Sequence, residues 1–495
     1  MKLSYQSTRG KERGLTASQA ILKGLADDGG LFMPTEIPQL DVSMEELSRM
    51  SYQDVAYEVM KLFLTDFTEE ELRQCINHAY DDKFDLEEIV SLVKADGAYF
   101  LELFHGSTIA FKDMALSILP HLMTVSAKKN QVDNEIVILT ATSGDTGKAA
   151  MAGFADVKGT RIIVFYPKGG VSKVQELQMV TQKGDNTSVV AIHGNFDDAQ
   201  SGVKKIFGDK DFAARLAEKG FQLSSANSIN IGRLVPQVVY YVYAYAQLLG
   251  NGEIQPGEQI NVTVPTGNFG NILAAYFAKK MGTPIKTLIC ASNDNKVLYD
   301  FFTTGTYDRN REFILTNSPS MDILISSNLE RLIYLSTGCD AEANGALMQE
   351  LSRDGKYTVT EEMKQNMADF AGGFADQAEN AAVIRKIYED TGYMIDTHTG
   401  VAAAVYQAYQ ASSHDSTKTV IASTASPYKF SRSVMDAVFG PQGDKDEFAI
   451  IDDLCQASHV AIPRAVEEIR NAPIRHHREC DAADMEAEVA DILGC

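Results

Sequence analysis

The sequence predicts an α/β protein in which helices cross over between the strands of parallel sheets. From about residue 98 to residue 430, short apolar strands alternate with helical segments, and several strand–helix junctions are rich in glycine. The chain has 495 residues, of which 45% are hydrophobic and 23% charged. These values are typical of globular proteins, so general disorder is excluded.

Residues 1–95 are predicted to form a separate helical domain. Thr16 is suited to cap the first helix, and the acidic run Glu69–Glu71 suits the first turn of the last one. Apolar residues recur at helical spacing in the segments 16–30, 43–50, 51–64 and 68–80.

The following part of the chain reads as strand, turn and helix in repeated order. Such sheets bind ligands where turns connect the carboxyl ends of strands to helix amino termini. The informative turns are therefore those after Thr140, Pro265 and Thr424. The expected strands cover residues 135–140, 161–167, 188–194, 221–226, 260–265, 287–292 and 419–424.

Charge and hydropathy exclude several classes of function. The 45 basic and 67 acidic side chains give a net charge of −22, which argues against binding to nucleic acid. No window reaches the roughly 18 apolar residues that span a bilayer, and the first residues lack a signal-peptide pattern. We therefore expect a cytoplasmic protein without a membrane partner.

Cysteine and histidine usage does not indicate a metal site or a thiol nucleophile. The six cysteines, which lack a CxxC pair, are expected to be reduced and mostly buried. His193, His398, His476 and His477 have no partners at metal-ligand spacing, so we expect no metal and no function for them.

Lys112 is the first candidate for chemistry. It stands between Phe111 and Asp113 at the start of a helix with an apolar face. A lysine there is either a surface cation lying along apolar side chains or a desolvated amine with a lowered pKa. A neutral amine can form a Schiff base with an aldehyde.

Two glycine-rich turns are candidates for binding anions. The turn at residues 142–147 lacks the first glycine and the final hydroxyl of a nucleotide P-loop, and the turn at 266–271 is not a dinucleotide fingerprint. Both offer backbone amides at a helix amino terminus, which suit a carboxylate or a phosphate.

Four segments in this order resemble fold-type II pyridoxal-phosphate enzymes. They are HGSTIAFKD, ATSGDTG, TGNFGN and STASPYKF. Further segments, among them YQSTRG, ADDGGLFMP, NSINIGRLVPQ and SPSMDILISSNLERL, are similar to the longer class of the threonine synthase family. The resemblance covers residues 4 to about 430.

The resemblance implies a tryptophan synthase β-like fold with two sheet-containing lobes and the added amino-terminal domain. Residues 96–140 and 236–440 would form the larger, cofactor-binding lobe, and residues 141–235 a smaller mobile lobe. Helices in 441–495 would pack on the larger lobe.

The resemblance also assigns roles at the site. Lys112 would bind pyridoxal 5′-phosphate as a Schiff base and act as the catalytic residue. The remaining cofactor contacts would come from Asp145, Gly267, Asn268, Phe269, Gly270, Asn271 and Thr424. Substrate would bind to Ser143, Gly144, Thr146 and Arg233, although Arg233 could equally be a structural surface cation.

The implied reaction converts O-phospho-L-homoserine and water into L-threonine and phosphate. The alternative is another fold-type II lyase, such as a threonine or serine dehydratase or a phospholyase, that gives a 2-oxoacid. The sequence leaves open whether the protein is a monomer or a homodimer.

Overall fold

The structure, a computed structural model, describes residues 3–142, 144–171 and 173–495. Two sheets organise the chain. One has six strands in the order β14-β11-β10-β15-β5-β4, and all neighbours are parallel except β4 and β5. Its strands are β4 (Ser91–Ala95), β5 (Ala98–Glu102), β10 (Ile260–Pro265), β11 (Ile285–Ser292), β14 (Phe370–Phe374) and β15 (Thr419–Ser423).

The second sheet has five strands in the order β16-β8-β7-β6-β9, and every neighbouring pair is parallel. Its strands are β6 (Glu135–Ala141), β7 (Thr160–Pro167), β8 (Thr187–His193), β9 (Phe221–Ser224) and β16 (Arg478–Asp481). Because β6 lies in this sheet, the smaller lobe already includes residues 135–141, which corrects the predicted boundary at 141.

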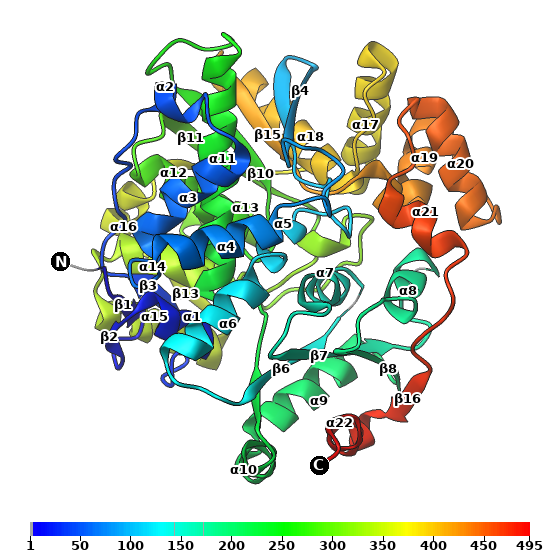
Figure 1. Cartoon of the computed structure of the whole chain (residues 1–495). Helices are drawn as coiled ribbons and strands as arrows, with labels where there is room; N and C mark the ends of the chain where they lie inside the picture. Colours follow the sequence, from blue (N-terminus) through cyan, green and yellow to red (C-terminus); the bar gives the residue numbers. More distant parts are fainter. Residues whose placement is uncertain (1–2, 143, 172) are drawn as a thin grey trace.

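Helices cover both faces of the smaller sheet. Figure 1 shows α9 and α22 on its outer side and α7 on the side that faces the rest of the molecule. The helices of this lobe are α7 (Asp145–Phe154), α8 (Lys173–Val180), α9 (Phe196–Gly208), α10 (Lys210–Glu218) and α22 (Met485–Leu493).

The larger sheet is surrounded by helices from distant parts of the chain. These are α5 (Asp113–Leu116), α6 (Leu119–Lys129), α11 (Ile231–Gly250), α12 (Gly270–Lys280), α13 (Val297–Thr304), α14 (Leu329–Ser336), α15 (Ala341–Asp354), α16 (Glu361–Asn366), α17 (Gln377–Thr391), α18 (Thr397–Ser413) and α19 (Ser431–Phe439). The hairpin of β12 (Thr306–Asp308) and β13 (Lys356–Thr358) lies among them.

The amino-terminal part is not purely helical, in contrast to the prediction. It contains α1 (Ala17–Lys23), α2 (Met44–Leu47), α3 (Tyr52–Phe63) and α4 (Glu69–Ala79). It also contains an antiparallel sheet of three short strands, β1 (Tyr5–Ser7), β2 (Arg13–Leu15) and β3 (Phe32–Pro34). Strands of three residues show no periodicity that the sequence could reveal.

The carboxyl-terminal segment divides between the two lobes. Helices α20 (Glu447–Ser458) and α21 (Arg464–Arg470) share an apolar cluster with α19. Strand β16, however, pairs with β8, and α22 shares a core with α9. The prediction that the whole segment packs on the larger lobe is therefore wrong for residues 478–493.

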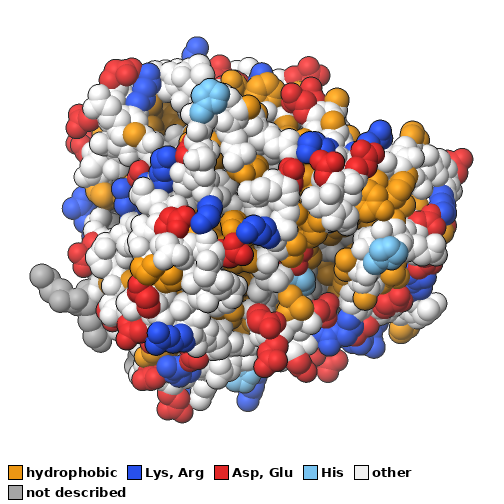
Figure 2. Space-filling model, turned by 90° about the horizontal axis from the view of Figure 1, so that it is seen from above, with side chains coloured by type: hydrophobic (Ala, Val, Ile, Leu, Met, Phe, Trp, Pro, Cys, Tyr) orange, Lys and Arg blue, Asp and Glu red, His pale blue; other side chains and the backbone are white. Residues whose placement is uncertain are grey.

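The surface charge is mixed on the face that Figure 2 shows. Lysine and arginine side chains are interspersed with aspartate and glutamate and do not gather in one patch. Among the described residues, no helix is long and apolar enough to cross a membrane.

Candidate active site

Lys112 lies on a segment that runs along the end of strand β15. The Phe111 amide donates to the Thr424 carbonyl at 2.8 Å, and Ala110 forms an antiparallel bridge with Ala425. Backbone bonds therefore hold Lys112 beside Thr424, although 312 residues separate them in the chain.

The turn before Lys112 is fixed by the buried carboxylate of Asp113. The Thr108 amide and hydroxyl donate to it at 2.8 and 2.6 Å, and Lys429 Nζ donates to the Thr108 carbonyl at 2.9 Å. Burial raises the pKa of Asp113, while the bonds from Thr108 and the charge of Lys429 oppose that rise. A buried and fully bonded carboxylate of this kind makes the turn rigid.

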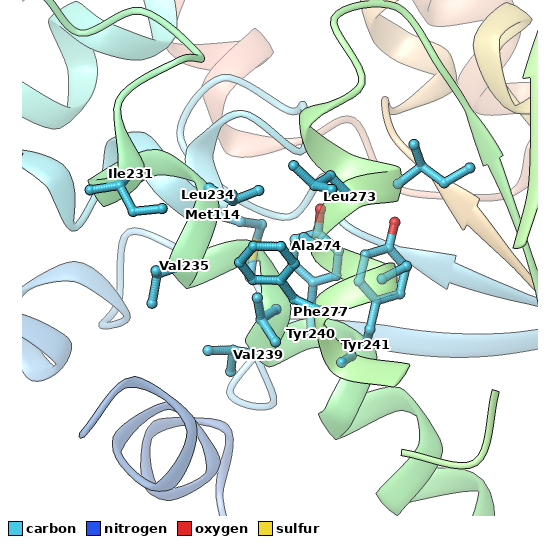
Figure 3. Packing of buried hydrophobic residues seen from close by; sticks show 14 of the residues in the cluster. Met114, Ile231, Leu234, Val235, Val239, Tyr240, Tyr241, Leu273, Ala274 and Phe277 are labelled. Atoms are coloured by element: carbon cyan, nitrogen blue, oxygen red, sulfur yellow. The ribbon is translucent and has the colours of Figure 1, made fainter. Parts of the chain in front are cut away.

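The helix that follows Lys112 is anchored in the core. Figure 3 shows Met114 of α5 among side chains of α11 and α12, including Leu234, Tyr240 and Leu273. Met114 is fully buried, whereas the Lys112 side chain is half-buried. The lysine thus stands at the edge of the core, with its backbone held and its amine within reach of a ligand.

The Lys112 amine points toward the turn that carries Ser320 in the 3₁₀-helix η1 (Pro319–Met321). Lys112 Nζ donates to Ser320 Oγ at 3.3 Å. Gly267 lies against the same residue, because a Cβ there would come within 2.6 Å of the Ser320 carbonyl. The structure thereby brings Lys112 and the 266–271 turn, two motifs predicted separately, to one place.

The 266–271 turn connects the end of β10 to the start of α12. Phe269, the N-cap of α12, has a φ of 65°, in the left-handed region, and makes no side-chain capping bond; in the first turn the Ile272 amide donates to Asn271 Oδ1 at 2.9 Å. The Gly267 carbonyl accepts from Ser326 Oγ at 2.6 Å, and the Asn268 carbonyl accepts from the Asn328 amide at 3.0 Å. With the carbonyls bonded outward, the uncapped amides of the helix start suit an anion.

Asn328 is in turn held by the buried guanidinium of Arg331. Arg331 donates to the Phe32 carbonyl at 3.1 Å, to the Ile229 carbonyl at 2.6 Å and to Asn328 Oδ1. Burial lowers the pKa of Arg331 to about 9. One side chain thus connects the amino-terminal domain, the loop before α11 and the support of the 266–271 turn.

The turn at 142–147 leads into α7. Thr142 Oγ1 accepts from the amides of Gly144 and Gly147, both at 3.0 Å, which closes the turn. Thr146 is half-buried in the first turn of α7. Ser143 and the side chain of Asp145 lie outside the described residues, so their predicted contacts stay predictions.

Arg233 is buried in the first turn of α11. It is 4% exposed, and its Nη1 donates to the Ala226 carbonyl at 2.9 Å. Its Nε has no hydrogen-bond partner in the part of the chain that the structure describes, and burial lowers its pKa to about 10. The reading of Arg233 as a surface cation is therefore wrong, and a buried guanidinium with an unused donor suits an anion.

Comparison with known proteins identifies the family. Residues 4–80 match the family described as "Threonine synthase N terminus", and residues 84–425 match "Pyridoxal-phosphate dependent enzyme". Threonine synthase of Saccharomyces cerevisiae is 36% identical over 88% of this chain and 89% of its own. The chain belongs to the threonine synthase family.

Solved threonine synthases have the same fold. The pyridoxal-phosphate-bound enzyme from Brucella melitensis is 35% identical and superposes with a TM-score of 0.88 over 99% of both chains. The yeast enzyme is 32% identical with a TM-score of 0.89, also over 99% of both chains. The predicted fold-type II fold, enzyme class and cofactor are thus confirmed.

The residues present fit the cofactor of threonine synthases. Three features lie around one position: the half-buried Lys112, the start of α12 and the buried Thr424. Ser292, the last residue of β11, has a buried hydroxyl without a partner among the described residues. An orphaned hydroxyl at the carboxyl end of a parallel strand is expected where a polar ligand binds.

Several neighbours of this position had no predicted role, and His398 was expected to have no function. Ser320, His398 and Asp396 form one hydrogen-bonded chain that ends at Lys112. Lys148 is 7% exposed on α7, and burial lowers its pKa to about 8. The available signal was the family-like segment SPSMDILISSNLERL, which carries part of the resemblance but held no residue with a predicted chemical role.

Proposed function

We propose that this protein converts O-phospho-L-homoserine and water into L-threonine and inorganic phosphate, with Lys112 as the reactive amine. The observation that carries the proposal is the position of Lys112 Nζ, 3.3 Å from Ser320 Oγ and beside the 266–271 turn. Family membership supports the reaction, because the threonine synthases of yeast and Brucella melitensis cover nearly the whole chain.

We assign the cofactor contacts from the geometry around Lys112. Bound pyridoxal phosphate supplies an electron-withdrawing ring that stabilises negative charge on the carbons of the substrate. The amides of Gly267–Asn271 would hold its phosphate at the start of α12. Thr424 would face the ring nitrogen and Asp145 the 3′-oxygen. A hydroxyl holds a proton on nitrogen less firmly than a carboxylate does, which favours a weaker electron sink suited to elimination and replacement.

We assign the substrate contacts to the two remaining elements. Ser143, Gly144 and Thr146 would line the carboxylate site at the turn before α7, with the Thr146 hydroxyl as a donor, since the Gly144 amide is already bonded to Thr142 Oγ1. Arg233 would bind the phosphate, since its Nε is a buried donor without a protein partner among the described residues. Its planar fork matches phosphate oxygens better than a lysine would.

Lys112 would work as a general base and then as a proton carrier. When its amine is not bonded to the cofactor, Lys112 would remove the Cα proton of the substrate and move protons between Cα and Cβ. As phosphate leaves from Cγ, Cβ loses a proton; Cγ then gains a proton and becomes the methyl group, water adds its hydroxyl at Cβ, and a proton returns to Cα. The rigid turn around Asp113 keeps the amine at one distance from these carbons.

The decisive experiment is product identification with the purified protein. Incubation with O-phospho-L-homoserine is expected to give L-threonine and equimolar phosphate. If 2-oxobutanoate is the main product, the protein is instead a dehydratase or phospholyase. Lys112→Ala is expected to abolish turnover and borohydride-reducible colour, whereas Lys128→Ala, on an exposed position of α6, should change neither.

We infer further that the smaller lobe closes over bound substrate, because α7 carries the carboxylate turn and packs against α5. Closure would exclude water until phosphate has left. The accessibility of the bound cofactor's fluorescence to an external quencher should fall when a substrate analogue is added. Unchanged accessibility would contradict closure.

A further inference from the structure

The hydroxyl that faces Lys112 belongs to a short turn held from behind by a histidine. Ser320 Oγ accepts from Lys112 Nζ at 3.3 Å, and the Ser320 backbone amide donates to His398 Nε2 at 3.1 Å. The turn thus connects the reactive amine to a side chain on α18, 78 residues further along the chain.

The tautomer of His398 follows from its two partners. Nε2 receives an N–H from the backbone, so it must be the acceptor nitrogen. Nδ1 lies 2.7 Å from Asp396 Oδ2, so it carries the hydrogen and donates it. His398 is 3% exposed and Asp396 is fully buried, and the imidazole ring lies 4.8 Å from that of Phe430. The ring has one orientation with both nitrogens bonded.

Asp396 also connects, through Thr399, to the end of strand β15. Its Oδ1 accepts from the amide and the hydroxyl of Thr399, and Thr399 Oγ1 lies 3.1 Å from Ser423 Oγ. Ser423 is the residue before Thr424. One buried carboxylate therefore supports both the turn that faces the Lys112 amine and the strand end that carries Thr424.

Capping of α18 does not require this arrangement. Asp340 and Asp376 cap α15 and α17 through the same amide bonds without a neighbouring histidine. At α18 the two amide bonds are divided between the carboxylate oxygens, and Oδ2, which accepts the His398 amide, also accepts from His398 Nδ1, whose other ring nitrogen holds the Ser320 amide. A buried imidazole placed between a helix cap and the turn that faces the Lys112 amine indicates a positioning function.

We propose that Ser320 positions the Lys112 amine during turnover, and that the Asp396–His398 pair positions Ser320. This inference rests on the proposed role of Lys112. Whenever the amine is free, the Ser320 hydroxyl can donate to its lone pair or accept one of its hydrogens, which keeps Nζ beside the reacting carbons. Without that hydroxyl, the amine loses one of the groups that orient it, and a smaller fraction of its rotamers is productive.

The test uses the full-length chain and two readouts. In the first, cofactor-free protein is mixed with pyridoxal phosphate. The Lys112 amine condenses with the aldehyde, water is released, and borohydride reduces the C=N bond so that the product can be mapped to Lys112. In the second, kcat and KM are measured with O-phospho-L-homoserine.

Ser320→Ala is expected to slow both bond formation at Lys112 and kcat by about 10- to 100-fold, with KM changed less than about threefold. Ser320→Thr keeps the hydroxyl and should restore most of both rates. His398→Gln keeps an acceptor for the Ser320 amide and should stay within about fivefold of the unchanged protein, whereas His398→Leu should match Ser320→Ala.

Matched controls separate positioning from general damage. Ser126→Ala and His121→Gln change a buried serine and a largely buried histidine of α6, and Asp340→Asn changes a helix cap elsewhere. All three should leave both rates unchanged. If folded Ser320→Ala forms the bond and turns over within twofold of the unchanged protein, the inference is wrong. If borohydride marks no bond at Lys112 even in the unchanged protein, the proposed function fails instead.

Discussion

Gly153 allows the smaller lobe to approach the helix that carries the reactive lysine. A Cβ at this position of α7 would lie 2.1 Å from the Leu116 carbonyl oxygen of α5 and 2.8 Å from its carbon. Ordinary contacts of this kind are about 3.4 Å. Gly153→Ala therefore requires α7 and α5 to separate by roughly 1 Å. The Leu116 amide is bonded to the Lys112 carbonyl at 2.9 Å, so that movement is transmitted to Lys112.

The expected change in the free energy of unfolding follows from two opposing contributions. Overpacking against rigid backbone costs about 3 kcal/mol, the upper end for buried insertions. Alanine in place of glycine inside a helix contributes about 1 kcal/mol in the stabilising direction. Gly153→Ala should therefore lower the free energy of unfolding by about 2 kcal/mol. Gly345 is also inside a helix, α15, but a Cβ there meets nothing within 4 Å, so Gly345→Ala should raise stability by about 1 kcal/mol.

Urea unfolding of the two variants beside the unchanged protein measures the difference, which should be about 3 kcal/mol in favour of Gly345→Ala. Turnover should fall in Gly153→Ala and stay unchanged in Gly345→Ala. If the two variants are equally stable and equally active, α7 and α5 are not in close contact and the reasoning is refuted.

Two further predictions concern buried cations. The pKa of Lys148 is lowered by burial from 10.5 to about 8, so between those pH values the unfolded chain binds more protons and rising pH stabilises the fold. At pH 7, Lys148→Met should have a free energy of unfolding up to about 3 kcal/mol higher than the unchanged protein. Urea unfolding at pH 7 and pH 10 should show that this difference becomes smaller at the higher pH. A difference that does not depend on pH would contradict the lowered pKa of Lys148. A lysine at position 331 cannot reach all three oxygens to which Arg331 donates. Arg331→Lys should therefore lower the free energy of unfolding, measured with urea, by about 3 kcal/mol, and it should weaken the binding of pyridoxal phosphate. The exposed Arg215→Lys is its control, and equal cofactor affinity in both would refute the link to the 266–271 turn.

The sequence predicted those parts of the fold that have a local signal. The strands at 135–141, 160–167 and 260–265 are apolar runs that end in glycine-rich turns, and the structure has them as β6, β7 and β10. The strands β1 to β3 have three residues each and no usable periodicity. The pairing of β16 with β8 joins residues about 290 positions apart, and nothing in either segment specifies its partner.

The residues of the candidate site likewise include some that have a local sequence signal and some that have none. Lys112 and the 266–271 turn could be found because a lysine at the head of an apolar helix and a glycine-rich strand–helix junction are both local patterns. The nearness of Lys112 to Thr424 came only from the family resemblance, because it depends on backbone bonds across 312 residues. Ser320 and His398 could not be found from spacing, since each is an ordinary polar residue until the fold joins them.

The supports of the site come from separate parts of the chain, and this explains why its geometry can be precise. Asp113 fixes the turn before Lys112, Arg331 fixes the neighbour of the 266–271 turn, and Asp396 fixes both the Ser320 turn and the strand end at Ser423. Each is a buried ionisable group, and each bonds to a different backbone segment of the site. Such groups are costly to desolvate, so a fold that needed only stability would bury apolar side chains in their place. Their concentration around one half-buried lysine is therefore best explained by the need to hold that amine, and the groups that surround it, within a fraction of an ångström.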